Sequence, residues 1–452
     1  MLIIHVPLAA AMYGIRPVAT AHAFGSFLLG LLFLARKRND LAMYMVAYMA
    51  GAEVLWRICE AQTNHEFAKF AGVLLLAGIG FRQFDFKRSA WIVFYFLLLL
   101  PSAYLTLDDL PLNFARKRLS FNLSGPLSLT MVVLTFSSLK ITAVQLRRLL
   151  LAFIYPGIGI CTCIAISLVT AEQLKFGTES NFETSAGFGP NQVSSILAMG
   201  AIAMFLFHMV FLNKRLFRSP FVQRQLALGL MALLLIQSAF TFSRSGLYMA
   251  VASILGAGVI LLKDGEARKK FVLSTAALSV LAFFVVLPVL NRYTEGAFLE
   301  RYLETDTSGR SDILTIELEL WKRNWLLGVG PGMRVYNIDD EDTASAAHTE
   351  YTRMIGEHGL LGVLALAILI FGIINRWKSI KDYRSKAVGT AFMICTLLFW
   401  AVNGMRIFAP QLIIGLLFVT ILWKPEADKP DFWMGILEEE SPPLDEPQMA
   451  ER

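Results

Sequence analysis

The chain has 452 residues, 56% of them hydrophobic and 17% charged, with a net charge of +6 at pH 7 and a mean hydropathy of +0.57. Water-soluble domains are typically about 45–50% apolar and about 25% charged, so the composition excludes an ordinary soluble domain. The positive charge does not indicate a nucleic-acid partner, because the sequence has no basic stripe interleaved with aromatic residues outside its apolar runs.

Long apolar runs recur along the chain, for example over residues 91–101, 226–239 and 359–374. Runs of roughly 17–25 apolar residues can cross a bilayer as helices. Lipid offers no water to backbone polar groups, so helices that satisfy their own hydrogen bonds are the natural spanning structure. The sequence predicts an all-α, polytopic membrane helix bundle of about 12–14 transmembrane helices. One large, partly helical loop outside the membrane is predicted between the late helices.

The N-terminal stretch argues against a removable signal peptide, and the cysteines argue against a disulfide or a zinc site. MLIIHVPLAAAMYGIRP lacks a positively charged start and a small-residue cleavage site, so it does not read as a removable signal peptide. Cys161, Cys163 and Cys395 lie in apolar runs, and Cys59 lies near the end of one. Neither a structural disulfide nor a zinc site is therefore expected.

The loops between the apolar runs alternate in charge. Short loops rich in Lys and Arg lie on the cytoplasmic side of a membrane, which predicts that both chain ends are cytoplasmic. Arg116, Lys117 and Arg118 are the exception, because they fall on the outer side; they can be an interfacial snorkelling patch or a contact to phosphate at the outer leaflet. The basic clusters are at residues 36–38, 87–88, 147–148, 214–218, 268–270 and 376–386, and the acidic or mixed loops are at residues 60–66, 108–125, 172–191, 243–246 and 291–353.

These patterns predict a transmembrane domain over residues 1–423 and a disordered cytoplasmic tail over residues 424–452, which is rich in Pro and acidic residues. Within the domain, the longest hydrophilic interval, residues 291–354, is predicted to form a loop on the outer side of the membrane. Apolar residues at helical spacing predict a helix over residues 311–325, and a glycine-rich turn follows it. A second helix is predicted to start near Ser345 and to continue into the next span.

The stretch HTEYTRMIGEHGLLG, which begins at His348, concentrates charged and titratable side chains at the end of this loop. Glu350, Arg353 and Glu357 lie three and four residues apart, as salt-bridging groups on one helix face do. His348 can be a histidine at a solvated helix end or a base, since imidazole is the commonest side chain for taking a proton near neutral pH. His358, near the membrane boundary, is interpreted as structural.

Isolated arginines fall on the same side: Arg244 in FTFSRSGLYMA, Arg310 in DTSGRSD and Arg406 in VNGMRIF. A charge at membrane depth is costly and suggests function by default, although Arg244 can instead form a structural ion pair with an acidic loop residue. Arginine binds phosphate through two hydrogen bonds and keeps its proton. A sugar on a lipid pyrophosphate already has a good leaving group, which arginines would neutralise, while the incoming hydroxyl needs a base. Such chemistry requires no metal and no other cofactor.

Five stretches resemble segments of the O-antigen ligase and polymerase superfamily, bacterial membrane enzymes that move glycans from undecaprenyl pyrophosphate. The first is His348 with Thr349, followed after nine residues by GLLG; the others are LLGVGPGM, SGRSDI, FSRSG and FGPNQ. Together they cover residues 187–374, the ligase-like region of the domain. Ligases more often have Asn, Ser or Gln at the position of Thr349, and the opening run also resembles exopolysaccharide polymerases. Ligase and polymerase therefore stay open.

The resemblance implies a metal-independent glycosyltransferase of cell-surface polysaccharide assembly, in the bacterial inner membrane with its active site facing the periplasm. It implies a lipid-linked oligosaccharide donor, a glycan or lipid-core acceptor, and contact with membrane lipids. The matched motifs imply that His348 is the catalytic base and that Arg244 and Arg310 bind pyrophosphate. The outer loop over residues 291–354 would then be the periplasmic catalytic loop. Arg406 and Arg353 are added as pyrophosphate ligands on topology and spacing alone.

Two other functions stay open. A protein O-oligosaccharyltransferase would use the same chemistry with a protein acceptor. A transporter or flippase of lipid-linked glycans would place charges through several spans and would need no long outer loop. Charges inside the predicted spans are few, mainly Glu53 and Arg57, and polar groups concentrate in one outer loop, which favours the enzyme.

Overall fold

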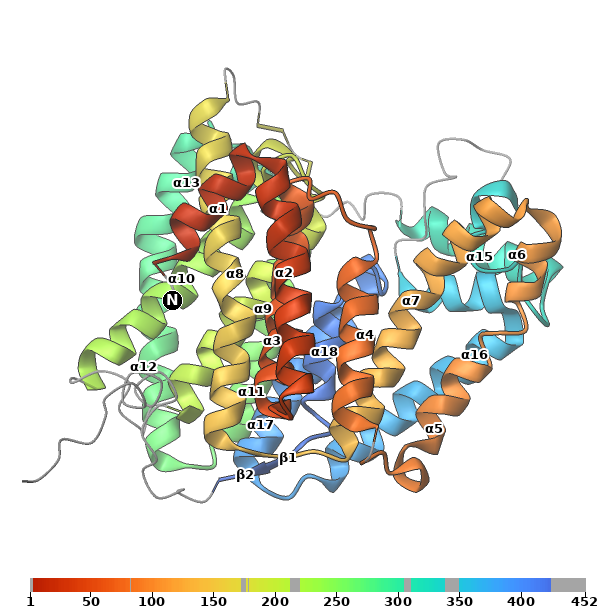
Figure 1. The fold of residues 1–452 in the computed structure, drawn as a ribbon. Coiled ribbons are helices and arrows are strands. Elements are labelled where there is room, and N and C mark those ends of the chain that lie inside the picture. Colours follow the sequence, from red (N-terminus) through yellow and green to blue (C-terminus); the bar gives the residue numbers. More distant parts are fainter. Residues whose placement is uncertain are drawn as a thin grey trace, which may run out of the picture.

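The protein is described by a computed structural model over residues 3–81, 83–171, 176–177, 179–211, 220–304, 310–337 and 349–423. These residues are helical almost throughout (Figure 1). The all-α, polytopic membrane helix bundle predicted from the sequence is confirmed. The tail predicted over residues 424–452 lies outside the described residues.

The described elements follow one another as helices, with one pair of short parallel strands. The helices are α1 (His5–Gly14), α2 (Arg16–Ala35), α3 (Asn39–Ile58), α4 (Phe67–Gly80), α5 (Phe86–Leu97), α6 (Ala103–Asp109), α7 (Leu112–Ser137), α8 (Ala143–Thr170), α9 (Pro190–Leu206), α10 (Pro220–Phe240), α11 (Arg244–Leu261), α12 (Gly265–Leu281), α13 (Leu287–Tyr293), α14 (Ala297–Leu303), α15 (Arg310–Arg323), α16 (Glu350–Ser379), α17 (Tyr383–Asn403) and α18 (Ala409–Gly415). The strands are β1 (Lys140–Thr142) and β2 (Thr420–Leu422).

Within the described ranges, eight helical stretches are long and apolar enough to cross a membrane. Phe67–Gly80 and Arg224–Phe240 are shorter apolar helices. The number predicted from the sequence is about 12–14, the upper value counting a short N-terminal crossing. Large apolar side chains such as Leu273 and Phe371 are exposed on the surface, as expected where a bundle faces lipid. The eight stretches are Arg16–Ala35, Leu112–Ser137, Ala143–Thr170, Pro190–Val210, Arg244–Leu261, Gly265–Tyr293, Glu350–Ser379 and Tyr383–Asn403.

Helix α9 lies at the centre of the bundle and is buried along almost its whole length. It packs against α10 and α11, and α11 in turn packs against α17. Gly246 of α11 contacts Ser194 of α9 so closely that a Cβ would lie 2.2 Å from the serine Oγ. Association in lipid depends on such close packing of small residues rather than on a hydrophobic driving force.

A group of elements that we call the outer lobe extends from one end of the bundle. It consists of α6, α15, residues 324–337 and the first turns of α16, which lie together on the right of Figure 1, while β1 and β2 lie at the opposite end of the bundle. Thr106 of α6 donates to the carbonyl of Pro331 at 3.1 Å, and the backbone N–H of Val329 donates to the carbonyl of Gly356 at 3.0 Å. The lobe therefore packs directly on the outer end of α16.

Candidate active site

The outer end of α16 carries a charged cluster on one helix face. Thr349 caps the helix, because its hydroxyl accepts the backbone N–H of Thr352 at 3.0 Å. Arg353 donates from Nε to Glu350 at 3.1 Å and from Nη1 to Glu357 at 2.9 Å. All three charged side chains are buried. The salt-bridging face predicted for Glu350, Arg353 and Glu357 is confirmed.

The loop over residues 404–408 joins α17 to α18 and carries Arg406. Glu350 accepts the backbone N–H of Met405 at 2.9 Å, which attaches the loop to the charged cluster on α16. Gly404 has a φ of +60°, and a Cβ there would lie 3.0 Å from the Glu350 carboxylate, so the position favours glycine. Burial lowers the pKa of Arg406, yet an arginine guanidinium keeps its proton in proteins. A desolvated cation in this position attracts anions.

A pocket lies between this loop, α7 and the outer lobe. Arginines and glutamates both line it, but the arginines are more numerous, so its wall is net positive. Arg406 and Arg353, both predicted pyrophosphate ligands, are brought together here. The lining residues are Arg118, Phe121, Asn122, Gly332, Arg334, Val335, Glu350, Arg353, Glu357, Gly404, Met405 and Arg406.

Arg118 comes from the basic cluster on the outer side that had two interpretations. Its Nη2 donates to the hydroxyl of Tyr336 at 3.4 Å, and its guanidinium carbon lies 5.4 Å from the centre of the same ring. Arg118 lines the same pocket as Arg406. This placement puts Arg118 at the wall of the net positive pocket. The basic cluster is visible in the sequence, but nothing in it singles out Arg118 as a site residue.

A buried ion pair supports the pocket from the lobe side. Arg334, which follows the glycine-rich turn, has its Nε 2.5 Å from Oε1 of Glu317 on α15, and both side chains are almost fully buried. Burial raises the pKa of Glu317 to about 7, with Arg334 opposing the shift and Glu357 adding to it. Sequence reasoning missed both residues. Glu317 is one of several charged residues in a predicted helix, and Arg334 lies directly after the LLGVGPGM stretch, outside the residues that carry the resemblance.

Arg244 begins α11, directly after Ser243, whose hydroxyl donates to Oδ1 of Asn191 at 2.7 Å. The Arg244 guanidinium donates through Nη1 to the backbone carbonyl of Glu304. The Glu304 carboxylate itself accepts from Arg301 at 3.1 Å. The acidic loop residue that meets Arg244 therefore contributes its carbonyl to this hydrogen bond.

Of the other two predicted site residues, Arg310 is described in part and His348 is not described. Arg310 begins α15, but its side chain lies outside the described residues, and so does the whole of His348. Thr349, the residue after His348, begins the described part of α16. His358 is fully buried, and its Nδ1 lies 2.5 Å from the hydroxyl of Ser102, in agreement with a structural role.

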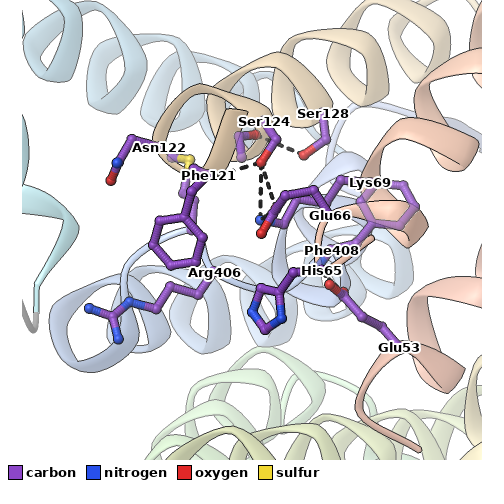
Figure 2. Close-up of polar contacts among 12 residues, drawn as sticks. Glu53, His65, Glu66, Lys69, Phe121, Asn122, Ser124, Ser128, Arg406 and Phe408 are labelled. Atoms are coloured by element: carbon purple, nitrogen blue, oxygen red, sulfur yellow. Dashed lines mark hydrogen bonds and ion pairs between the residues drawn. The ribbon is translucent and has the colours of Figure 1, made fainter. Parts of the chain in front are cut away.

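A second charged network lies beside Arg406. In Figure 2, Arg406 lies near Phe121 and His65, with Glu66 and Lys69 beyond them. Lys69 pairs with Glu66, which also accepts from Ser124 of α7 at 2.7 Å. This pair joins α4 to α7, and all three side chains are buried.

In the parts of the chain that the structure describes, no group of three or more His, Cys, Asp or Glu side chains is arranged to hold a metal ion. Residues 226–367 match the family model described as O-antigen ligase. No curated protein matches the chain. The match confirms the resemblance to the O-antigen ligase and polymerase superfamily. It supports a multi-pass membrane protein with a glycosyltransferase-like enzyme activity of the ligase or polymerase type in polysaccharide assembly.

Proposed function

We propose that this O-antigen ligase-like protein transfers a glycan from a polyprenyl pyrophosphate, such as undecaprenyl pyrophosphate, to a sugar hydroxyl of a glycan or lipid-core acceptor. The reaction would take place at the periplasmic face of the bacterial inner membrane. The observation that carries the proposal is the net positive pocket at the outer lobe, where Arg406, Arg353 and Arg118 come together beside the end of α16.

The proposed step exchanges one bond for another. The acceptor hydroxyl attacks the anomeric carbon of the donor sugar and loses its proton to His348. The bond between that carbon and the pyrophosphate oxygen breaks, and its electron pair stays on the departing pyrophosphate. Cationic side chains stabilise the charge that develops there. The proposed scheme uses no metal and no cofactor.

The arginines have different proposed roles. Arg244 and Arg310 bind the pyrophosphate, as the matched motifs imply. Arg406 and Arg118 add positive charge from the pocket wall. Arg353 is held by Glu350 and Glu357, so we propose that it contributes a fixed positive charge rather than a new pair of hydrogen bonds.

The proposed division of the chain follows from these roles. Residues 1–423 form one transmembrane domain, residues 187–374 are its ligase-like region, and residues 291–354 are the catalytic loop. The pocket uses residues of α7 and of the loop over residues 404–408 as well. The proposed activity therefore needs more of the chain than residues 226–367, the segment that matches the family model.

His348→Ala tests the proposed base. We expect transfer from undecaprenyl-pyrophosphate-linked oligosaccharide to fall by about 100- to 10,000-fold, the usual contribution of a general base. The measurement is product formation by purified protein in detergent, with melting temperature as the check on folding. His208→Ala is a matched control, since His208 bonds Ser274 and does not line the pocket. Retained activity of His348→Ala would remove it as the base.

Arg244→Lys tests the proposed pyrophosphate ligand at constant charge. A lysine ammonium cannot form the planar pair of hydrogen bonds that a guanidinium forms with phosphate. A hydrogen bond to a charged group contributes about 1.5–3 kcal/mol, so we expect kcat/KM for the same donor to fall at least about tenfold. Arg268→Lys, in the exposed start of α12, is the control. Wild-type kcat/KM in Arg244→Lys would favour a structural role for Arg244.

Excess chelator tests the proposed metal-free scheme. We expect the wild-type protein to keep its transfer activity, and complete loss of transfer would contradict the scheme.

A further inference from the structure

We propose that the buried Glu53–Arg57 pair of α3 is the positioning element for the loop that carries Arg406, and that it joins this loop to the one that carries Arg244. The effect of this pair on catalysis rests on the proposed function. Both residues precede the segment that matches the family model, residues 226–367. Their role therefore comes from the packing of the first half of the chain against the second.

Arg57 contacts several loops at the outer end of the bundle through two nitrogens. Its Nη2 donates to Oε1 of Glu53 at 2.5 Å, to the carbonyl of His65 at 3.0 Å and to the carbonyl of Arg406 at 3.3 Å. Its Nη1 donates to Oε1 of Gln192 at 3.0 Å. The side chain is 8% exposed. One buried guanidinium thus connects α3, the connection between α3 and α4, the Arg406 loop and the start of α9.

Glu53 completes the attachment of the Arg406 loop. Its Oε1 accepts from Arg57, and its Oε2 accepts the backbone N–H of Phe408 at 2.5 Å. Figure 2 shows the Glu53 carboxylate directed at Phe408. On the other side of Arg406, the N–H of Met405 donates to Glu350. Charged side chains from α3 and α16 therefore hold the backbone on both sides of Arg406, through charge-assisted hydrogen bonds that are stronger than neutral ones.

The start of α9 extends the connection to Arg244. Gln192, which accepts from Arg57, is adjacent to Asn191, and Asn191 accepts from the hydroxyl of Ser243 at 2.7 Å. Ser243 directly precedes Arg244. The two loops that carry proposed pyrophosphate ligands are thus fixed to the same helix end, one of them through Arg57.

Burying the Glu53–Arg57 ion pair has a free-energy cost. An ion pair inside a membrane protein is expensive, and apolar residues of similar size often stabilise a fold as well or better. The pair therefore needs a reason beyond stability. Holding a cation where negative charge develops lowers the barrier without any rearrangement during the reaction, and a displacement of about 1 Å in such a group can cost about 100-fold in rate.

The test replaces both charges together. In Glu53→Met/Arg57→Met no charge is left buried without a partner, so we expect the variant to fold with a melting temperature near or above that of wild type. We also expect kcat/KM for undecaprenyl-pyrophosphate-linked oligosaccharide to fall by about 10- to 100-fold, and hydrogen exchange of residues 404–408 to rise. Glu266→Met/Lys270→Met removes an ion pair at the start of α12, away from the pocket lining, and should change neither measurement.

Two outcomes would overturn the inference: unchanged hydrogen exchange of residues 404–408 in the double variant, or faster exchange with wild-type kcat/KM. Hydrogen exchange does not depend on the reaction, so a wild-type protein that transfers no glycan would contradict the proposed function while the exchange result still decides the attachment of the loop. Should the double variant fail to fold, Arg57→Lys serves instead. A single ammonium has at most three hydrogens for the acceptors that Arg57 contacts, so we expect an intermediate rise in exchange and an intermediate loss of kcat/KM.

Discussion

Glu317 lies buried against Arg334 in the outer lobe, and burial raises the pKa of its carboxyl from 4.5 to about 7. A carboxyl with a raised pKa binds its proton more tightly in the folded protein than in the unfolded chain. Its contribution to stability is therefore fully present below about pH 4.5 and is lost as the pH rises through about 7. The lobe is thus expected to be held more firmly in mildly acidic medium than at neutral pH.

Glu317→Gln tests this contribution, because glutamine does not titrate. We expect the melting temperature of wild type, relative to that of the variant, to fall between about pH 4.5 and pH 7 and to level off above that range. Thermal unfolding in detergent at several pH values measures the difference. Glu319→Gln, on the exposed side of the same helix, is the control. A difference that is constant with pH would contradict a raised pKa.

For single residues, the sequence indicates which charged side chains are unusual but not which groups they contact. Arg406 stood out because an isolated charge next to an apolar run is costly, and the structure places it in a charged pocket. Glu53 and Arg57 stood out for the same reason, but a pattern of charges does not say that their partners are Gln192 and the loop over residues 404–408. Such partners come from packing between distant segments, which spacing along one helix does not contain.

At the scale of elements, α16 is two helical segments with a break at Gly359. This glycine has φ +60° and ψ −140°, a conformation open mainly to glycine. The break turns the carbonyls of Gly356 and Glu357 toward the lobe, where they accept from Val329 and Gly330 at 3.0 Å each. The sequence predicts a helix that continues into the next span. It does not predict the change of direction at Gly359, because a glycine within a helical pattern does not by itself reveal one.

Gly359→Ala should weaken the attachment of the lobe. A Cβ would lie 2.5 Å from the backbone nitrogen of Gly328, and a strained backbone of this kind costs about 1–3 kcal/mol. We expect a lower melting temperature and faster proteolysis of residues 324–337. Gly229→Ala on α10, where a Cβ would meet nothing within 4 Å, should be neutral or slightly stabilising. Equal melting temperatures for the two variants would contradict a backbone requirement at Gly359.

At the scale of the whole molecule, contacts between loops form two groups that agree with the alternation of charge. At one end, β1 pairs with β2, and Tyr383 donates to Asp264 at 3.1 Å. At the other end, Arg57 joins His65, Gln192 and Arg406. Each contact connects loops that the charge pattern assigns to the same side of the membrane. The helical architecture was predictable because hydropathy and charge act along the chain, whereas the arrangement of α3 against α9 and the Arg406 loop depends on packing.

This grouping predicts which loops face the periplasm. In a variant without its native cysteines, Gln62→Cys and Asn324→Cys, both at exposed positions of the outer group, should react with a membrane-impermeant thiol reagent in intact spheroplasts. Lys37→Cys and Lys381→Cys, exposed in basic loops at the other end, should react only after the membrane is permeabilised, because Lys- and Arg-rich loops stay in the cytoplasm. Labelling is measured by mass shift on a gel. Reaction of Lys37→Cys in intact spheroplasts would invert the orientation and would place the arginine pocket on the cytoplasmic side, away from any periplasmic acceptor.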